Sequence, residues 1–302
     1  MSGLAVRAAA AVRSPGRREP DDRRAALDYF RDLLAPFGEK PDEELFDGGP
    51  HVRHRDLADL LVADEGVGGS RPELLIVTHA LPDVVPFTAV APYLTDRLGG
   101  RAANFAIAQQ GLAAPFTALR IASAYARAGR AAEVVIAVLE QTTLPTPFPL
   151  VRDALPVRDD PPVRDDPPVR NDPPVRDDPP AQGVPLVDSA AALVLGTGED
   201  GGDGNGPRFV RARSAGSPAD ALGREPAEDG TLLVLGPWVT GDVPEHAGPV
   251  HRVAPGSYCT SLWLDLADHW REWGRDHRRI VLCDTDPRSG RTHTALFAGG
   301  ES

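Results

Sequence analysis

The residue types that perform covalent catalysis are sparse in this sequence. Cysteine occurs only at Cys259 and Cys283, and the two form no CxxC pair, so neither a disulfide framework nor a structural zinc site is indicated. Cys259 follows a glycine-containing loop and could serve as an acid or base, although such a cysteine is more often a small buried apolar residue. Ser257, His251 and Asp284 could form a Ser-His-Asp set for hydrolysis or acyl transfer, but no spacing rule fixes their geometry.

The other histidines suggest structural roles. His51 and His54 have an i, i+3 spacing, but no third metal ligand is nearby and their neighbours are charged, so a solvated surface is expected there. His79 ends an apolar run at a position where a sheet can present functional groups, and a hydrogen-bonded structural role is the simpler interpretation. His269 and His277 flank two tryptophans on one amphipathic segment, which indicates packing or an interface.

Composition and charge limit the kinds of binding partner and the cellular compartment that are expected for this chain. The chain has 302 residues, and its 32 basic and 44 acidic side chains give a net charge of −12, which argues against nucleic acid or an anionic membrane. An acidic carrier protein would need a local basic patch. Arginines interrupt the alanine-rich N-terminus too early for a signal-peptide core, and no apolar stretch reaches the roughly 20 residues of a membrane span. A cytoplasmic location is expected, and neither a metal nor another cofactor is indicated.

A hexapeptide repeat interrupts the chain. VRDDPP or VRNDPP occurs four times in tandem over residues 157–180, and its paired prolines exclude both a helix and a sheet ladder. We therefore expect a disordered, extended insertion at 156–181, either an expansion in a tolerant surface loop or a docking arm for a partner. A second break, rich in glycine and aspartate, spans 196–207 and predicts a flexible loop.

Outside these breaks, strand and helix signals alternate as in an α/β protein. The first half contains apolar strand signals around an alanine-rich helix, and the second half repeats this order in shorter form. The strand signals lie at 72–80, 101–108, 131–140, 185–196, 231–239 and 278–284, and the helix signals at 112–129 and 261–274. The repetition predicts an internally duplicated fold with one half at 1–195 and a shortened second half at 208–302.

Four segments, in order and spacing, resemble the thiolase superfamily, and in particular its ketoacyl-ACP synthase III branch. They are LLIVTHALPDVVPFTA (74–89), NFAIAQQGLAAPFTALRIASAYARAGRAAEVVIAVLE (104–140), PLVDSAAALVLG (185–196) and PGSYCTSLWLDLAD (255–268). The resemblance covers nearly the whole chain outside the repeat. It implies a layered αβαβα fold built from two duplicated halves.

The resemblance also implies where a catalytic set would lie. In that family a cysteine at the start of the buried helix is acylated, while a histidine and an asparagine act in decarboxylation and backbone amides stabilise an oxyanion. Here the cysteine position falls on Gly111 or Leu112, the histidine position on Gly236 and the asparagine position on Ser257. The glycine-rich oxyanion turn is replaced by a segment that begins at Cys283 and contains Asp284.

Loss of a coupled catalytic set predicts that this chain is not catalytic on its own. The resemblance implies a dimer in which an active synthase III paralogue supplies the cysteine, for condensation of acyl thioesters in fatty acyl or polyketide-type secondary metabolism. Gln109, Gln110, Leu112 and Phe87 would then lie at the interface or pocket. Two alternatives stay open: an active acyltransferase or thioesterase on acyl-ACP or acyl-CoA that uses Ser257, Cys259 or His251, and an acyl-binding scaffold homodimer.

Overall fold

The computed structural model describes most of the chain as a layered α/β structure. The residues described are 3–20, 22–85, 88–148, 186–198, 206–225, 229–240, 242–246 and 248–299. The hexapeptide repeat, Phe87 and most of the glycine- and aspartate-rich loop lie outside these residues, so the predictions made for them are not tested. No helix in the described ranges is both long and apolar enough to cross a bilayer.

The first half of the chain contributes five strands to one side of a ten-stranded sheet. Their spatial order is β3-β2-β4-β5-β1. β2 is parallel to both β3 and β4, whereas β5 is antiparallel to β4 and to β1. The strands are β1 (Ala5–Arg13), β2 (Leu74–His79), β3 (Ala103–Ile107), β4 (Glu133–Glu140) and β5 (Ser189–Gly196).

The second half repeats this arrangement strand for strand. Its order, read inward from the other edge, is β8-β7-β9-β10-β6, with β7 parallel to β8 and β9, and β10 antiparallel to β9 and β6. The halves join where β1 and β6 pair at Ala5 and Arg208. This topology confirms the predicted duplication. The strands are β6 (Arg208–Ala215), β7 (Thr231–Leu235), β8 (Val250–Arg252), β9 (Arg279–Thr285) and β10 (Thr292–Ala298).

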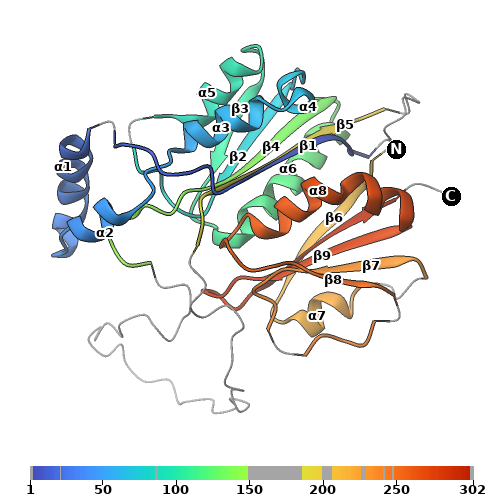
Figure 1. Ribbon diagram of the computed structural model, residues 1–302. Coiled ribbons are helices and arrows are strands. Elements are labelled where there is room, and N and C mark those ends of the chain that lie inside the picture. The colour runs from blue at the N-terminus through green and yellow to red at the C-terminus, as the bar shows by residue number, and fades with distance from the viewer. Residues whose placement is uncertain are drawn as a thin grey trace, which may run out of the picture.

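Two helices fill the space between the half-sheets. α6 (Ala114–Arg127) contacts β2 and β4 on one side and β6 and β10 on the other, and α8 (Ser261–Asp276) contacts β1, β5, β7 and β9 (Figure 1). Phe116 of α6 packs edge-on against Trp263 of α8 at the centre of the main core. Because both helices are covered by sheet on opposite sides, most of their apolar residues are buried, and in α6 the apolar residues that are exposed or partly exposed lie mainly in the last turn, from Ala124 on.

Outer helices complete five layers. α3 (His54–Val62), α4 (Glu65–Gly68) and α5 (Val90–Arg97) cover the first half-sheet, and the short α7 (Pro218–Leu222) packs on β6, β9 and β10 of the second. α1 (Arg23–Leu34) and α2 (Glu43–Gly48) form a separate small core beside the first half (Figure 1). The thiolase-like αβαβα architecture expected from the sequence is therefore confirmed.

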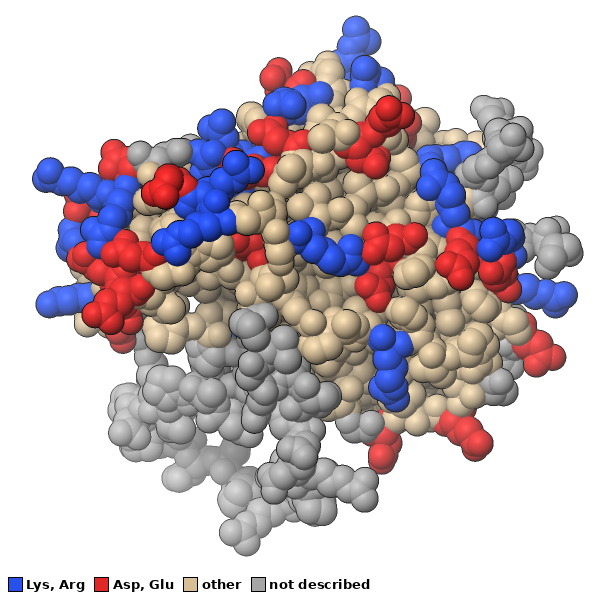
Figure 2. Space-filling model, in the orientation of Figure 1, with Lys and Arg blue, Asp and Glu red and all other residues tan. Residues whose placement is uncertain are grey.

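The charges on α1 and α2 are interspersed. Figure 2 shows basic and acidic side chains next to one another on this part of the surface. Arg23 binds both Glu43 and Asp47, and Arg31 binds Asp28. The two helices consequently present no purely basic surface to an acidic partner.

Candidate functional site

The loops that precede α6 and α8 meet at the centre of the molecule. Before α6, Gln109 has φ = 61° and Gly111 has φ = 52°, both in the left-handed region that favours glycine. A Cβ atom added to Gly111 would overlap with the hydroxyl of Tyr258, from the loop before α8, and would lie 3.1 Å from Asp286 Oδ2. The side-chain position at 111 is thus already occupied by groups from the second half.

Tyr258 and Trp238 fill this central space. Both are buried, and their rings pack edge to face with 6.4 Å between centroids. Tyr258 donates its hydroxyl proton to Asp286 Oδ1 at 2.9 Å, while Trp238 Nε1 donates to the carbonyl oxygens of Ser257 and Tyr258 at 3.2 and 3.0 Å. Burial, together with the neighbouring Asp286, holds the pKa of the Tyr258 phenol far above its usual range. The phenol therefore stays protonated and acts as a hydrogen-bond donor.

Glu140 fixes the loop before α8. This residue ends β4, is fully buried, and accepts hydrogen bonds from the backbone N–H groups of Tyr258 and Cys259, each at 2.6 Å. Burial raises the pKa of the Glu140 carboxyl. Burial, and then the Glu140 charge, raise the pKa of the Cys259 thiol well above its usual value, so Cys259 does not offer a thiolate.

Asp284 occupies the space beside Gly236. A Cβ atom at Gly236 would overlap with the Asp284 carboxyl group. Asp284 Oδ1 accepts hydrogen bonds from the backbone N–H groups of Trp238 (3.2 Å) and Thr285 (2.9 Å). Burial raises the pKa of this carboxyl well above its usual value, since the charged form would be poorly solvated.

The residues considered for a Ser-His-Asp set do not come together. Ser257 Oγ lies 2.6 Å from Ser261 Oγ, and His251 Nε2 lies 2.8 Å from Asp265 Oδ2, with its ring against Trp273. Asp284 instead binds the two backbone amides named above. Each member of the hypothetical triad thus has a different partner, and none is positioned to activate Ser257.

The predicted interface residues divide into exposed and buried groups. Gln109 and Gln110 are exposed at the end of β3, and Gln110 accepts a hydrogen bond from Thr117 Oγ1 at 2.8 Å. Leu112 is buried in the main core. Whether these residues meet a partner stays a prediction.

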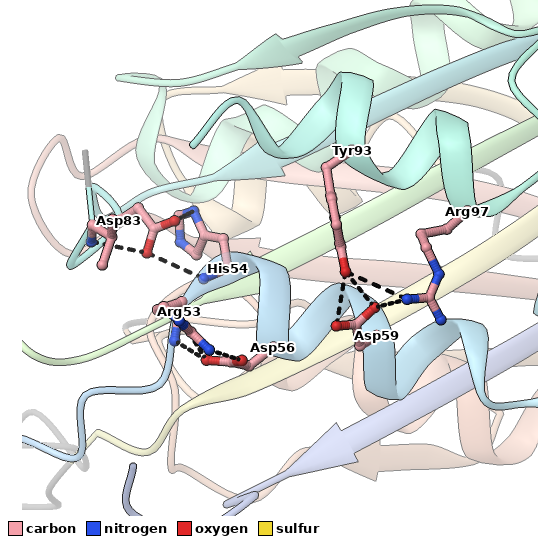
Figure 3. Close-up of polar contacts among 8 residues, drawn as sticks. Arg53, His54, Asp56, Asp59, Asp83, Tyr93 and Arg97 are labelled. Carbon is pink, nitrogen blue, oxygen red and sulfur yellow. Dashed lines mark hydrogen bonds and ion pairs between the residues drawn. The ribbon is translucent and has the colours of Figure 1, made fainter. Parts of the chain in front are cut away.

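The expectation of a solvated surface at His51 and His54 is wrong. The two residues are only 3% and 1% exposed. His51 packs against Phe46 and its backbone N–H donates to Thr143 Oγ1, whereas His54, at the start of α3, lies against the loop that follows β2. There His54 lies against His79, with 4.9 Å between ring centroids. The backbone N–H of His54 donates to Asp83 Oδ1 at 3.1 Å (Figure 3). Sequence reasoning missed Asp83 as a neighbour of His54 and His79, although Asp83 follows the strand signal that contains His79.

This cluster is not arranged as a metal site. Among the described residues, no three His, Cys, Asp or Glu side chains are grouped in a way that could hold a metal ion. The His54–His79–Asp83 cluster instead borders a cavity of about 560 Å³.

Comparison with known proteins gives matches at the level of structure. No family model and no curated protein matches the chain. The 3-oxoacyl-(acyl carrier protein) synthase III FabH from Pseudomonas aeruginosa superposes with a TM-score of 0.55 at 16% identity, covering 99% of each chain. A variant of OleA from Xanthomonas campestris with cerulenin gives a TM-score of 0.57 at 15% identity, covering 98% of this chain and 96% of that one.

A third structure extends the same result. The 3-oxoacyl-[acyl-carrier-protein] synthase III from Aquifex aeolicus has a TM-score of 0.56 at 12% identity, covering 98% of this chain and 100% of that chain. The similarity spans essentially the full length of all three structures, so it includes both halves of the duplicated sheet. The chain therefore has the thiolase-like fold that these condensing enzymes share.

Proposed function

We propose that this chain is a non-catalytic synthase III-like subunit that pairs with an active synthase III paralogue in acyl-thioester condensation. The observation that carries the proposal is the contact between Gly111 and Tyr258. At Gly111, one of the two positions where the resemblance places an acylated cysteine, the backbone has no side chain and the volume of a side chain holds the hydroxyl of Tyr258. A substrate thioester has no room to approach this point.

The position expected for the histidine supports the same conclusion. At Gly236 the volume of a side chain holds the carboxyl group of Asp284, which also engages the N–H groups of Trp238 and Thr285. Those amides are therefore not available to stabilise an oxyanion. In both places a glycine is paired with a larger side chain from another segment, Tyr258 from a loop and Asp284 from β9, so the volume of the lost side chain is filled.

In a heterodimer, a chain without catalytic residues would support the active site of its partner. The resemblance implies pairing through the nucleophile-loop side of the fold, where β3 is the edge strand and Gln109 and Gln110 are exposed. The paralogue would supply the cysteine, histidine and asparagine, and this chain would support its loops and shape its acyl pocket. The acyl group would arrive on acyl carrier protein or coenzyme A.

Size-exclusion chromatography with light scattering tests the proposal, on the chain alone and co-expressed with an intact synthase III paralogue from the same genome. Ketosynthase activity is assayed in each peak. We expect a stable 1:1 complex that condenses acyl thioesters, and loss of activity when the paralogue's catalytic cysteine is replaced by alanine. Replacing Ser257 or Cys259 by alanine in this chain should leave the activity of the complex in place.

Two outcomes would contradict the proposal. A homodimer that transfers or hydrolyses acyl groups unaided, and loses this activity with Ser257→Ala or Cys259→Ala, would show a rewired enzyme. A homodimer that binds acyl groups, has no catalytic activity and forms no complex with any synthase III paralogue would indicate an acyl-binding scaffold.

A further inference from the structure

A cavity of about 560 Å³ opens beside edge strand β3, away from the filled central site. Its wall is largely apolar, with aromatic and aliphatic side chains from α1, the start of α5 and β3, including Phe30, Val90 and Phe105. At one end lie the polar side chains of His54, His79 and Asp83. Its volume and its composition, apolar with a few polar groups at one point, are typical of small-molecule sites.

Two polar atoms at this end have no partner. Among the described residues, neither His54 Nε2 nor Asp83 Oδ2 makes a hydrogen bond, although the two side chains are only 2% and 9% exposed. His54 Nδ1 lies 3.9 Å from Asp83 Oδ2, which is too long for a hydrogen bond. Buried polar groups are normally satisfied, so these atoms mark a place where a polar group of a ligand would fit.

The cluster is rich in hydrogen-bond acceptors. Burial raises the pKa of Asp83 to about 6, so its carboxyl group is ionised at neutral pH and only accepts. Burial also lowers the pKa of His79, and its Nδ1 lies 2.9 Å from the carbonyl oxygen of Leu81. Since a carbonyl oxygen only accepts, Nδ1 carries the proton and Nε2 is left as an acceptor.

The arginines near His54 lie against groups other than Asp83, and the Arg55 guanidinium stands over the Tyr93 ring, 5.6 Å from its centroid. Figure 3 shows Arg53 bound to Asp56 and Arg97 bound to Asp59 and turned away from Asp83. Burial lowers the pKa of His54 to about 3, so that ring is neutral as well. The Asp83 carboxylate therefore faces the cavity beside two neutral imidazoles.

We propose that this cavity binds a small apolar primary amine, with the ammonium group on Asp83 and the apolar body between α1 and β3. An ammonium group has three donors and no acceptor, which matches the acceptors of Asp83 and His79. A carboxylate or phosphate would be repelled by Asp83. The cavity and the central site share no residue, but the cavity opens beside β3, the edge through which the proposed pairing would occur, so the test uses the chain alone.

Isothermal titration calorimetry on the full chain at pH 7.5 tests the inference, with n-octylamine, 1-octanol and octanoate as probes of equal chain length. We expect saturable binding of octylamine, at least about tenfold tighter than that of the other two. Asp83→Asn should weaken octylamine binding at least about tenfold, whereas Asp59→Asn, a carboxylate outside the cavity, should not. Ala106→Trp fills the cavity from exposed strand β3 and should block binding even if Asp83→Asn folds poorly.

Several results would overturn the inference. Octanoate binding as tightly as octylamine would refute the acceptor argument. Unchanged octylamine binding in Asp83→Asn or Ala106→Trp would show that the amine binds outside this cavity. Absence of saturable amine binding would refute it outright. If in that case Asp83→Asn and Ala106→Trp shifted the monomer–dimer equilibrium, the cavity would be a seat for a second copy of the chain.

Discussion

Replacing Gly111 by alanine should destabilise the protein by about 2–5 kcal/mol, because two costs coincide at this residue. The backbone has φ = 52°, where a residue with a Cβ atom costs about 1–2 kcal/mol more than glycine. The new Cβ would also overlap with the hydroxyl of Tyr258, and overpacking of a dense core costs about 1–3 kcal/mol. The two costs can be separated because each has its own control variant.

Gly129→Ala measures the backbone cost alone. Gly129 lies just beyond the C-terminal end of the same helix, α6, has φ = 66°, and has no atom within 4 Å of an added Cβ among the described residues. Tyr258→Phe measures the hydroxyl alone, and should cost about 1.5–3 kcal/mol as a lost hydrogen bond to a charged group. Asp286 keeps its bonds from Arg288 N and Ser289 Oγ in that variant.

The double variant Gly111→Ala/Tyr258→Phe measures the interaction free energy between the new Cβ atom and the Tyr258 hydroxyl. Without the hydroxyl, the nearest atoms to the new Cβ are Asp286 Oδ2 at 3.1 Å and the Tyr258 ring at 3.4 Å, so the overlap is relieved. The double variant should therefore be about 1–2 kcal/mol more stable than the two single changes predict by addition. Urea unfolding of the four proteins, followed by tryptophan fluorescence, measures this difference.

Additivity within about 0.5 kcal/mol would refute the reasoning, as would a Gly111→Ala variant no less stable than Gly129→Ala. Either result would mean that Tyr258 does not fill the position at 111. The space for a nucleophile would then be open, and the proposal of a filled site would lose its main support.

Three further predictions concern buried groups. Glu140→Gln should cost about 1–3 kcal/mol of unfolding free energy, because an amide NH₂ would face a backbone N–H, whereas Glu133→Gln at the start of the same strand should cost less; urea unfolding compares them. Asp83 has a folded-state pKa of about 6 against 3.8 when unfolded, so its contribution to stability is fully present below about pH 4 and is lost as the pH rises through 6. The stability of the wild type relative to Asp83→Asn should therefore fall by about 3 kcal/mol between pH 4 and pH 7, and a constant difference would contradict the burial of this carboxyl. Cys259 and Cys283 are buried and their thiol pKa values are raised, so both should react with a thiol reagent only at the rate of unfolding, and a fast native-state reaction of either would show an accessible thiolate.

The elements that the sequence predicts well are those with continuous apolar runs. β2, β4 and β9 are buried on both faces, so each contains a continuous apolar run of at least four residues. α6 and α8 show clear helical periodicity. β1 was missed because its alanine-rich sequence has low strand propensity, and its place in the sheet is fixed by its neighbours β5 and β6.

The filled site could be predicted only in part. The resemblance indicates that the usual catalytic residues are missing, because glycines stand at positions 111 and 236 of the sequence. It does not indicate what fills them. Tyr258 reaches Gly111 from the loop before α8 in the other half, and Asp284 reaches Gly236 from the neighbouring strand β9, so both contacts depend on the folded arrangement. The inward turn at His54 was missed for a similar reason, since its charged neighbours Arg53 and Asp56 bind each other and leave the histidine to the interior.

The duplication explains how a site of this kind can be filled so completely. In each half a strand leads into a loop and then into a central helix, and the two-fold arrangement of the halves places the two loops face to face. A larger residue in one loop can therefore occupy the volume opened by a glycine in the other, as Tyr258 does at Gly111. Once both members of such a pair have changed, restoring one alone leads to a steric clash or a cavity, and each costs stability. If the chain is the non-catalytic subunit proposed above, the filled centre serves only as packed core, and its contribution to the complex comes from its surface.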